Sequence, residues 1–322
     1  MSIKVVVTDC SWGSIDVEKQ YLPQDAIVEG YQLTTEEEVI ETCYDADAIL
    51  SEYAPLSSKV LKSLKKCKII SNTAIGFDNI DLKAAEELGI AVANVPGYCA
   101  HEVADHAMAL ILSTCRNISV YDRSVRKGEW NLEAGLEMDR LEGQVLGLAG
   151  FGRIPQFAAK RAQGFGFKVI ASDPYIKQEY ADTLGVKMVE LDELLAESDI
   201  FSCHIPLMKD TIGYFNKEKF DKMAKKPIFI NTSRGKLVNE DDLVKALENK
   251  QIKAAALDVL IDEPPLKNNK LLTFENVTIT PHAGFFSKTA LYEVRSRSAM
   301  NVVNFFNGDF DKISIVNKVI KK

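Results

Sequence analysis

Short apolar runs alternate with stretches of helical periodicity along the first part of the chain. The apolar runs predict strands at Ile3–Thr8, Ala48–Leu50, Lys68–Ser71 and Ile90–Ala93, and the stretches between them predict helices at Thr35–Cys43, Ser58–Lys65 and Asp81–Leu88. Thr35 with Glu38 three residues later forms a capping box, and Asp81 and Gly89 stand where an N-cap and a terminal glycine belong. Strands that alternate with helices predict a parallel sheet.

A second alternation of the same kind begins near residue 144. Its predicted strands are Gln144–Gly150, Phe167–Ser172, Asp199–His204, Pro227–Asn231, Ala254–Asp258 and Val277–Thr280. Two long amphipathic stretches, Ala100–Lys127 and Lys288–Phe306, flank this part and predict helices that cross between domains, the second returning the chain to the first domain. The pattern as a whole predicts an α/β protein with two doubly wound parallel-sheet domains.

Length and charge narrow the class of protein. The chain has 322 residues, which exceeds the usual size of one domain. Its net charge of −7 argues against a non-specific nucleic-acid partner, because such affinity depends on lysines and arginines that neutralise phosphates. No apolar run approaches the roughly 20 residues that span a bilayer, and the six cysteines are scattered without a C-x-x-C pair. We therefore expect a cytoplasmic protein with reduced thiols, no membrane partner and no metal site.

A glycine-rich turn follows one predicted strand directly, in the sequence VLGLAGFGRIPQFAAKRA. In a dinucleotide site the first glycine permits a tight turn, the second lets the pyrophosphate approach the backbone, and the third allows the helix to pack closely on the strand. Gly150 and Gly152 fill the first two positions, but Pro155 occupies the third. Because proline is tolerated in the first turn of a helix, we still predict that the N–H groups of Gly152, Arg153 and Ile154 bind a phosphate.

The next predicted strand leads to a carboxylate at the expected distance. Asp173 follows the first glycine by 173 − 150 = 23 residues, near the roughly 20 at which dinucleotide sites place the acid that binds the adenine ribose. Its charge favours NAD over NADP, because a 2′-phosphate would meet a like charge. Two plainer interpretations stay open: a glycine-rich turn that holds no nucleotide, and a turn-forming Asp173 ahead of Pro174.

Seven further stretches occur in order along the chain: AIGFDNIDL, NVPGYCAHEVADHAMALIL, GFGRIPQ, HIPLMKDT, INTSRGKLV, ALDVLIDEPP and TPHAG. In these the chain resembles the NAD-dependent D-isomer-specific 2-hydroxyacid dehydrogenase family over nearly its whole length, and within it the bacterial branch similar to C-terminal binding protein. The resemblance implies a flavodoxin-like substrate domain from residues 1–99 and 291–322, with an inserted Rossmann NAD-binding domain from residues 100–290. It also implies a homodimer formed through the NAD-binding domains.

The resemblance assigns catalytic roles to three residues. Arg234 matches the arginine that holds the substrate carboxylate and polarises the carbonyl, Glu263 matches the acid that pairs with histidine, and His282 matches the proton donor. Reduction of a 2-keto acid needs a hydride at carbon and a proton at oxygen, and histidine supplies a proton near neutral pH. Taken singly, each residue has a plainer interpretation: a surface ion pair, a solvated loop charge and a structural histidine.

The resemblance also implies contacts with cofactor and substrate. The implied cofactor contacts are His204, Pro206, Thr211, Thr232, Ser233, Asp258 and Gly284, and the implied substrate contacts are the backbone N–H groups of Ile75 and Gly76, the Arg234 side chain, and the side chains of Tyr53 and Leu56. Asp258 is expected beside the nicotinamide carboxamide. Of the four histidines, His101 and His106 are expected to be structural or hinge contacts.

The predicted substrate is a small unphosphorylated 2-keto acid or the matching D-2-hydroxy acid. Phosphoglycerate dehydrogenases of the family carry arginines in two substrate-domain loops, whereas the loops here, SEYAPLSS and SNTAIGFDN, contain none. Three alternatives stay open: a phosphoglycerate dehydrogenase despite these loops, a dimeric binding protein regulated by NAD and similar to C-terminal binding protein, and, least favoured by the charge, a nucleic-acid-binding protein.

Overall fold

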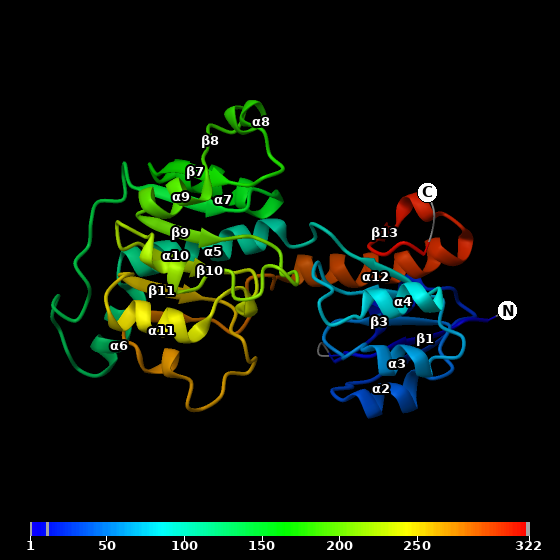
Figure 1. The fold of residues 1–322 in the computed structure, drawn as a ribbon. Coiled ribbons are helices and arrows are strands. Elements are labelled where there is room, and N and C mark those ends of the chain that lie inside the picture. The colour runs from blue at the N-terminus through cyan, green and yellow to red at the C-terminus, as the bar shows by residue number, and fades with distance from the viewer. Residues whose placement is uncertain (1, 11–12, 320–322) are drawn as a thin grey trace. The chain divides into compact units, whose positions relative to one another are not determined.

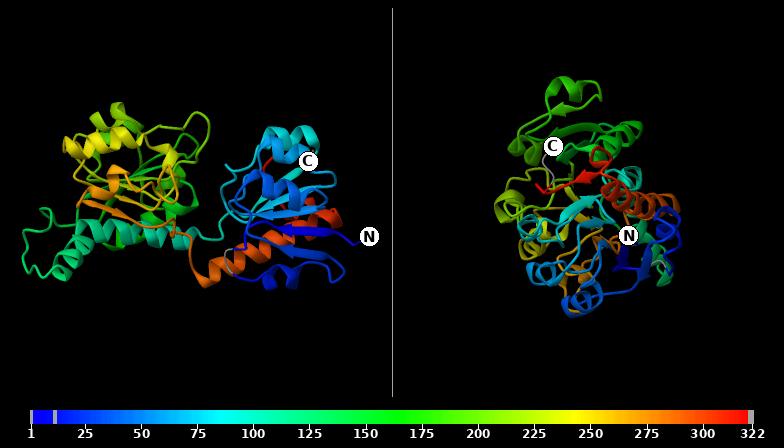
Figure 2. Two further views of the ribbon diagram at one scale, coloured as in Figure 1. Left: turned by 90° about the horizontal axis from the view of Figure 1, so that it is seen from below. Right: turned by 90° about the vertical axis from the view of Figure 1, so that its right-hand side faces the viewer.

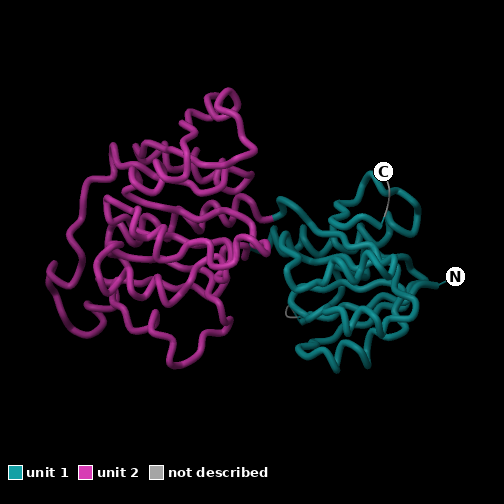
Figure 3. Tube along the Cα trace, viewed as in Figure 1, with its two compact units in different colours: residues 1–98, 287–322 teal, residues 99–286 magenta. Residues whose placement is uncertain are grey.

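The computed structural model describes residues 2–10 and 13–319. The chain divides into two compact units, unit 1 with Met1–Tyr98 and Ser287–Lys322, and unit 2 with Cys99–Phe286 (Figure 3). The insertion thus runs from residue 99 to 286, where the motifs predicted 100 to 290.

Unit 1 is a doubly wound sheet with one added edge strand (Figure 1). Its strands are β1 (Lys4–Val7), β2 (Ile27–Gly30), β3 (Ala48–Ser51), β4 (Ile69–Asn72), β5 (Ala91–Asn94) and β13 (Ser314–Ile315). The order is β13-β5-β4-β3-β1-β2, and β13 pairs with β5 antiparallel while the other pairs are parallel. The parallel part has the flavodoxin-like order, so the predicted fold of this unit is confirmed.

The helices of unit 1 are α1 (Asp16–Tyr21), α2 (Glu36–Cys43), α3 (Ser58–Ser63), α4 (Leu82–Leu88) and α12 (Lys288–Asn307). Residues that alternate along the strands face opposite sides of the sheet. Val6, Ile49 and Ile70 pack with α2, α3 and α4, whereas Val5 and Leu50 pack on the side of α12. Figure 2 shows α12 lying along one face of this sheet. Because both faces are covered, the central strands are buried throughout.

Unit 2 has a seven-stranded parallel sheet with the order β12-β11-β10-β9-β6-β7-β8. Its strands are β6 (Val145–Ala149), β7 (Lys168–Ser172), β8 (Lys187–Met188), β9 (Ile200–Cys203), β10 (Ile228–Asn231), β11 (Ala254–Leu257) and β12 (Val277–Ile279). Counted from β6, the first six strands follow the Rossmann order 3-2-1-4-5-6, which places a switch point between β6 and β9. The predicted Rossmann domain is confirmed.

The helices of unit 2 are α5 (Ala100–Cys115), α6 (Ile118–Arg126), α7 (Arg153–Gly164), α8 (Gln178–Asp182), α9 (Leu191–Glu197), α10 (Lys217–Asp221) and α11 (Glu240–Glu248). One face of the sheet packs on α5 and α7, the other on α9, α10 and α11. No helix within residues 2–10 and 13–319 is both long and apolar enough to cross a membrane.

Three predictions about helices meet different outcomes. The Thr35–Glu38 capping box is confirmed, as is the α4 cap, where the Asp81 side chain accepts from Ala84 N and Gly89 ends the helix at φ 68°. The single long helix over Ala100–Lys127 is wrong, because Asn117 adopts φ 53° and separates α5 from α6. The idea of crossing helices also needs correction, since α5 belongs wholly to unit 2 and α12 wholly to unit 1.

Candidate active site

The turn between β6 and α7 has the geometry that its glycines predict. Gly150 has φ 91°, and a Cβ there would lie 2.7 Å from the carbonyl oxygen of His204. At Gly152 a Cβ would meet nothing within 4 Å, so the backbone is open to a ligand. Among the residues that the structure describes, no side chain caps α7, and the first-turn N–H groups of a helix have no intrahelical partners. This combination of an open backbone and a helix N-terminus fits a pyrophosphate.

Pro155 lies inside the first turn of α7, as the sequence predicted, and its side chain is buried. Its ring stands where a third glycine would permit closer packing on the strand. The helix continues through it, since Gln156 N donates to Gly152 O at 3.2 Å. The altered third position therefore leaves the turn and the helix N-terminus intact.

Asp173 lies directly beside this turn. Its Oδ2 accepts from the N–H of Phe151 at 2.8 Å, and its Oδ1 accepts from the N–H of Tyr175 at 2.9 Å. Each carboxylate oxygen keeps a lone pair for another donor, which is what a ribose hydroxyl requires. The residues present thus fit the adenosine half of a dinucleotide, with Asp173 holding the ribose and the start of α7 holding the pyrophosphate.

His204 follows β9 beneath the glycine-rich turn. Its N–H donates to Ala149 O at 2.7 Å, and its Nε2 lies 2.9 Å from Ser202 Oγ. Burial lowers the pKa of the imidazole to about 4, so the ring is neutral at physiological pH. Thr211 shapes the loop that follows, because its Oγ1 donates to Pro206 O at 2.9 Å and accepts from Met208 N at 2.7 Å. Pro206 itself is exposed.

The strongest acid–base feature is the pair His282 and Glu263. His282 Nδ1 lies 2.7 Å from Glu263 Oε2, while Glu263 Oε1 accepts from Leu260 N at 3.0 Å. The N–H of His282 donates to Asp258 O at 2.8 Å, which fixes the backbone at φ 51°. The carboxylate therefore binds Nδ1, and the ring nitrogen suited to exchange a proton with a substrate is the other one, Nε2.

Arg234 is joined to this pair through close backbone packing. It follows β10, and its Nη1 donates to Ser233 O at 2.8 Å. A Cβ on the next residue, Gly235, would stand 2.0 Å from the carbonyl oxygen and carbon of Leu260. The residue after arginine must therefore be glycine, because the backbone that carries Arg234 packs directly on the loop whose N–H group Glu263 binds.

Thr232 and Ser233 lie at the carboxyl end of β10. Asn231 organises this turn, with its Oδ1 accepting from Ser233 N at 3.0 Å and its Nδ2 donating to Arg234 O at 2.9 Å. Thr232 Oγ1 is buried and has no hydrogen-bond partner within residues 2–10 and 13–319. A buried hydroxyl without a partner at the ligand-binding end of a Rossmann sheet fits a polar group of the cofactor.

Asp258 is almost fully buried and forms a compact network. Its carboxylate accepts from Thr280 Oγ1 at 2.6 Å and from the N–H groups of Ala283 and Gly284 at 2.9 and 2.8 Å. His106 Nε2 lies 3.2 Å from the same carboxylate. Burial opposes ionisation, but these hydrogen bonds, with that of His106 the largest among them, hold the pKa of the Asp258 carboxyl below its usual value.

His106 and Thr280 are the residues of this network that sequence reasoning missed. His106 was expected to be a structural or hinge contact, yet its Nε2 also lies 2.9 Å from Thr280 Oγ1 and it faces the turn that follows His282. The one available signal was the helical position of His106 on α5, which packs on β10 and β11. His101 has the structural surroundings expected of it, since it stacks on Phe157 with ring centroids 4.0 Å apart.

The implied substrate contacts of unit 1 have different outcomes. Ile75 and Gly76 lie in a half-buried loop after β4. Tyr53 follows β3 and is 53% exposed. Leu56 is wrong as a substrate contact, because its side chain is 0% exposed in the core beneath α2 and α3, where it has no surface to offer a ligand.

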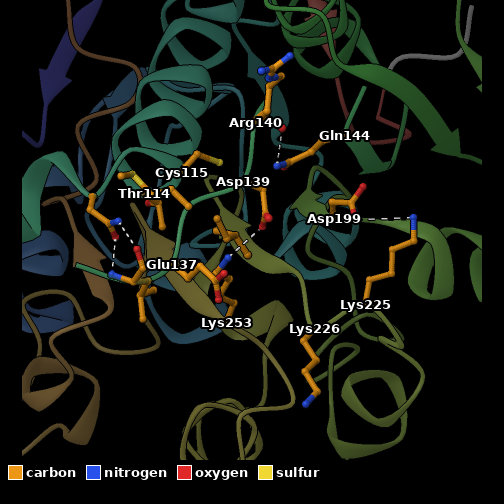
Figure 4. A pocket seen from close by; sticks show the side chains of 14 residues that line it. Thr114, Cys115, Glu137, Asp139, Arg140, Gln144, Asp199, Lys225, Lys226 and Lys253 are labelled. Atoms are coloured by element: carbon orange, nitrogen blue, oxygen red, sulfur yellow. Dashed lines mark hydrogen bonds and ion pairs between the residues drawn. The ribbon is translucent and has the colours of Figure 1, made fainter. Parts of the chain in front are cut away.

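A cavity of about 380 Å³ lies at the amino ends of the unit 2 strands, opposite the carboxyl ends that carry Asp173 and His282 (Figure 4). Its lining includes Gln144, Asp199 and Lys253, which immediately precede β6, β9 and β11. Charged side chains pair across it, with Lys225 at 3.7 Å from Asp199 and Lys253 at 3.2 Å from Asp139. Ligands of open α/β sheets bind at the carboxyl ends of the strands, so this cavity is separate from the site of Asp173 and His282.

The fold and the site together define an NAD-linked oxidoreductase with two α/β domains. Residues 108–284 match the model of the D-isomer specific 2-hydroxyacid dehydrogenase NAD-binding domain. A glyoxylate reductase of Korarchaeum cryptofilum is 37% identical over 292 residues, which cover 88% of this chain and 86% of that one. The chain therefore belongs to the D-isomer-specific 2-hydroxyacid dehydrogenase family. It is an NAD-dependent enzyme that interconverts 2-hydroxy and 2-keto acids by hydride transfer to NAD or from NADH.

Two further relatives extend this comparison. A D-3-phosphoglycerate dehydrogenase of Archaeoglobus fulgidus is 38% identical over 265 residues, which cover 82% of this chain but only 50% of that one. The chain thus spans about half the length of this relative. The crystal structure of D-lactate dehydrogenase from Aquifex aeolicus with NAD and lactic acid superposes with a TM-score of 0.90 at 28% identity, covering 99% of this chain and 100% of that one.

Replacing Asp173 tests the preference between the two dinucleotides. We expect Asp173→Asn to weaken NADH binding roughly tenfold or more, because a charge-assisted hydrogen bond is lost, and to narrow the gap between NADH and NADPH, because the repulsion of a 2′-phosphate disappears. Fluorescence titration with each dinucleotide gives both dissociation constants, and Asp182→Asn on exposed α8 is the control. An unchanged ratio between the two constants would remove Asp173 from the ribose site.

Proposed function

We propose that this enzyme reduces a small, unphosphorylated 2-keto acid to the D-2-hydroxy acid with NADH, and catalyses the reverse oxidation with NAD. The observation that carries the proposal is the 2.7 Å contact between His282 Nδ1 and Glu263 Oε2 at the carboxyl end of the Rossmann sheet. That geometry suits a histidine that exchanges a proton through Nε2. Bound NADH supplies the hydride.

Each of the proposed catalytic residues has a defined task. Arg234 binds the substrate carboxylate and polarises the carbonyl, since a guanidinium offers paired donors to a planar anion. His282 donates the proton to the carbonyl oxygen as the hydride reaches carbon, and Glu263 stabilises the imidazolium that exists before that transfer. Asp258 holds the turn after His282 and, in this proposal, orients the nicotinamide carboxamide.

The proposed cofactor contacts follow the carboxyl ends of the strands. We assign the pyrophosphate to the N–H groups of Gly152, Arg153 and Ile154, and the ribose to Asp173. The remaining contacts that we propose for the dinucleotide are His204, Pro206, Thr211, Thr232, Ser233 and Gly284. The unpartnered hydroxyl of Thr232 and the neutral ring of His204 support two of these assignments.

The charge of the two unit 1 loops that are expected to face the substrate argues against a phosphorylated substrate. In the loops 51–57 and 72–80 of unit 1 the charged residues are Glu52 and Asp78, both anionic. A phosphate would need arginine or lysine donors there, and would instead meet like charge. The name D-3-phosphoglycerate dehydrogenase of the Archaeoglobus relative is therefore not transferred to this chain. The names glyoxylate reductase and D-lactate dehydrogenase of the other two relatives support a small substrate.

The test is the oxidation of NADH at 340 nm with glyoxylate, pyruvate, hydroxypyruvate, 2-ketoisocaproate, phenylpyruvate and 3-phosphohydroxypyruvate. We expect turnover of the smaller unphosphorylated acids and a kcat/KM at least tenfold lower for the phosphorylated one. Preference for 3-phosphohydroxypyruvate would overturn the substrate assignment. Silence with every acid, while NADH binds, would overturn the proposed activity and favour a binding protein regulated by NAD.

We further propose that the enzyme is a homodimer formed through the NAD-binding units. The segment between α6 and β6 loops outward from the unit 2 sheet (Figures 1 and 2). It carries Trp130 and Leu132, which are 89% and 82% exposed. Exposed large apolar side chains that lie close together along a loop are typical anchors of protein–protein interfaces. The location that we propose is the cytoplasm, which the six free thiols support.

Polar substitution of this loop tests the dimer. We expect Trp130→Ser combined with Leu132→Ser to shift the protein from the mass of two chains to that of one at micromolar concentration, because the anchors of the interface are removed. Light scattering after gel filtration measures the mass. Ile27→Ser removes a side chain that is 54% exposed on unit 1 and should leave the mass unchanged. A dimeric double variant would exclude this loop as the interface.

A further inference from the structure

The loop that follows β4 in unit 1 has three consecutive carbonyl groups that are all held by hydrogen bonds. Ala74 O accepts from the N–H of Val95 at 3.0 Å. Ile75 O accepts from Asn94 Nδ2 at 2.7 Å, and Gly76 O accepts from Asn72 Nδ2. The donors come from the ends of β4 and β5 and the residue after it, so neighbouring strand ends fix the orientation of three successive peptide groups.

This orientation determines where the N–H groups point. In a trans peptide the C=O of one residue and the N–H of the next point in opposite directions. With the carbonyls of residues 74, 75 and 76 turned toward the strand ends, the N–H groups of Ile75, Gly76 and Phe77 point the opposite way. Successive backbone N–H groups turned to one side can form an anion-binding concavity. This loop therefore offers hydrogen-bond donors suited to a carboxylate, and Phe77 joins the two residues expected from the motif.

The two asparagines are buried and leave little freedom to the loop. Asn94 is 7% exposed, and its Oδ1 accepts from Ser314 Oγ at 2.7 Å, so the amide orientation is fixed from both ends. Asn72 is 0% exposed, and its Oδ1 has no partner within residues 2–10 and 13–319. A buried unsatisfied acceptor destabilises the folded state, so stability alone gives no reason for an asparagine at this position.

Helix α12 supports the same loop through a buried polar network. Ser298 Oγ lies 3.0 Å from Ser71 Oγ and 3.1 Å from Thr73 Oγ1. Asn301 Nδ2 donates to Ser71 Oγ at 3.1 Å and to Asn94 O at 3.2 Å. These contacts connect the start of the loop and the end of β5 to one rigid helix, so the loop is held from the sheet and from α12.

We infer that Asn72 and Asn94 are positioning residues, which orient the peptide groups of residues 74–77 so that their N–H groups bind the substrate carboxylate. This inference rests on the proposed function. It predicts that either amide can be removed without loss of cofactor binding, whereas the affinity for the keto acid falls because the N–H groups are no longer pre-organised.

The chain offers a matched control for Asn94. Asn317 is also 7% exposed in unit 1, where its Nδ2 donates to Ile90 O at 2.8 Å and its Oδ1 accepts from Val92 N at 3.0 Å. Asn94→Ala and Asn317→Ala therefore each remove a buried amide that makes two hydrogen bonds, one to the backbone and one to a side chain for Asn94 and two to the backbone for Asn317. Only the first substitution releases the loop. Comparable losses of thermal stability are expected from the two.

The experiment measures KM for the best keto acid, KM for NADH, and the binding of oxamate to the NADH complex by calorimetry. We expect Asn94→Ala to raise KM for the keto acid and the oxamate Kd roughly tenfold or more, with KM for NADH within about twofold, and Asn317→Ala to change none of these. Asn72→Ala should raise the same two constants while leaving KM for NADH unchanged. It should cost less thermal stability than Asn94→Ala, because the substitution also removes the unsatisfied acceptor Asn72 Oδ1.

The outcomes distinguish a failure of the proposed function from a failure of the positioning role of Asn72 and Asn94. Wild-type enzyme that neither turns over a keto acid nor binds oxamate would overturn the proposed function. Wild-type turnover together with unchanged KM and oxamate affinity in Asn72→Ala and Asn94→Ala would leave the function standing and overturn the positioning role. Equal KM effects in Asn94→Ala and Asn317→Ala would also overturn it, since a general loosening of unit 1 would then explain both.

Discussion

His282→Asn is expected to lower kcat for keto-acid reduction by ~10²–10⁴-fold, the usual contribution of a positioned general acid. That range corresponds to about 3–5 kcal/mol of activation free energy. Asparagine is the suitable replacement because His282 has φ 51°, and asparagine tolerates the left-handed region better than alanine does. The variant keeps the hydrogen bond from the backbone N–H of residue 282 to Asp258 O, and it removes the imidazole ring that is hydrogen-bonded to Glu263.

Two measurements show whether this loss belongs to the chemical step. NADH affinity, measured by fluorescence, should remain within about threefold, because the ring contacts Glu263 and not the glycine-rich turn. Glu263→Gln should give a smaller fall in kcat, since the glutamine still presents an oxygen to Leu260 N but no longer a charge to the imidazole. His101→Asn is the control histidine. A kcat for His282→Asn within tenfold of wild type would show that another group delivers the proton.

The sequence predicted the elements that carry strong local signals. Buried parallel strands are continuous apolar runs, and both sheets were predicted from them. The Rossmann and flavodoxin-like folds came from the family resemblance. Strands β2, β8 and β13 were missed because they lie at or near sheet edges, where Ile27 is exposed and the runs are as short as two residues. The break at Asn117 had a signal, because asparagine is the residue other than glycine that most readily adopts φ near 53°.

The sequence predicted the candidate site residues that lie in motifs, but not the contacts that hold these residues in place. Strand-end positions pointed to Asp173, His204 and His282, since carboxyl ends of parallel strands meet at one edge. The contact of His106 with Asp258 does not follow from spacing along the chain, because it depends on how α5 packs on the sheet, and the sequence signalled it only through the position of His106 on that helix. Leu56 was implied by the resemblance, and a motif does not tell which of its side chains enter the core.

Gly235→Ala is expected to impair both stability and catalysis, although it adds one methyl group. The Cβ would lie 2.0 Å from Leu260 C and O and 2.5 Å from Ile261 N, so the backbone itself must move. Overpacking of this kind typically costs about 1–3 kcal/mol, and here no flexible side chain can yield. The displaced segment carries the N–H that Glu263 binds, so Arg234 and His282 would lose their alignment with each other. Misalignment by about 1 Å commonly costs ~10²-fold in rate.

Thermal unfolding and steady-state kinetics together check this expectation. Gly164→Ala is the matched control, because it makes the same change near the end of α7, where a Cβ meets nothing within 4 Å. That variant should keep full activity and unfold at the wild-type temperature or slightly above it, since alanine favours helix over glycine. Gly235→Ala should unfold several degrees lower and lose at least tenfold in kcat/KM while still binding NADH at low temperature. Wild-type values of kcat and KM in Gly235→Ala would mean that the Leu260 loop moves independently of Arg234. The inference that Gly235 couples Arg234 to the Glu263–His282 pair would then be wrong.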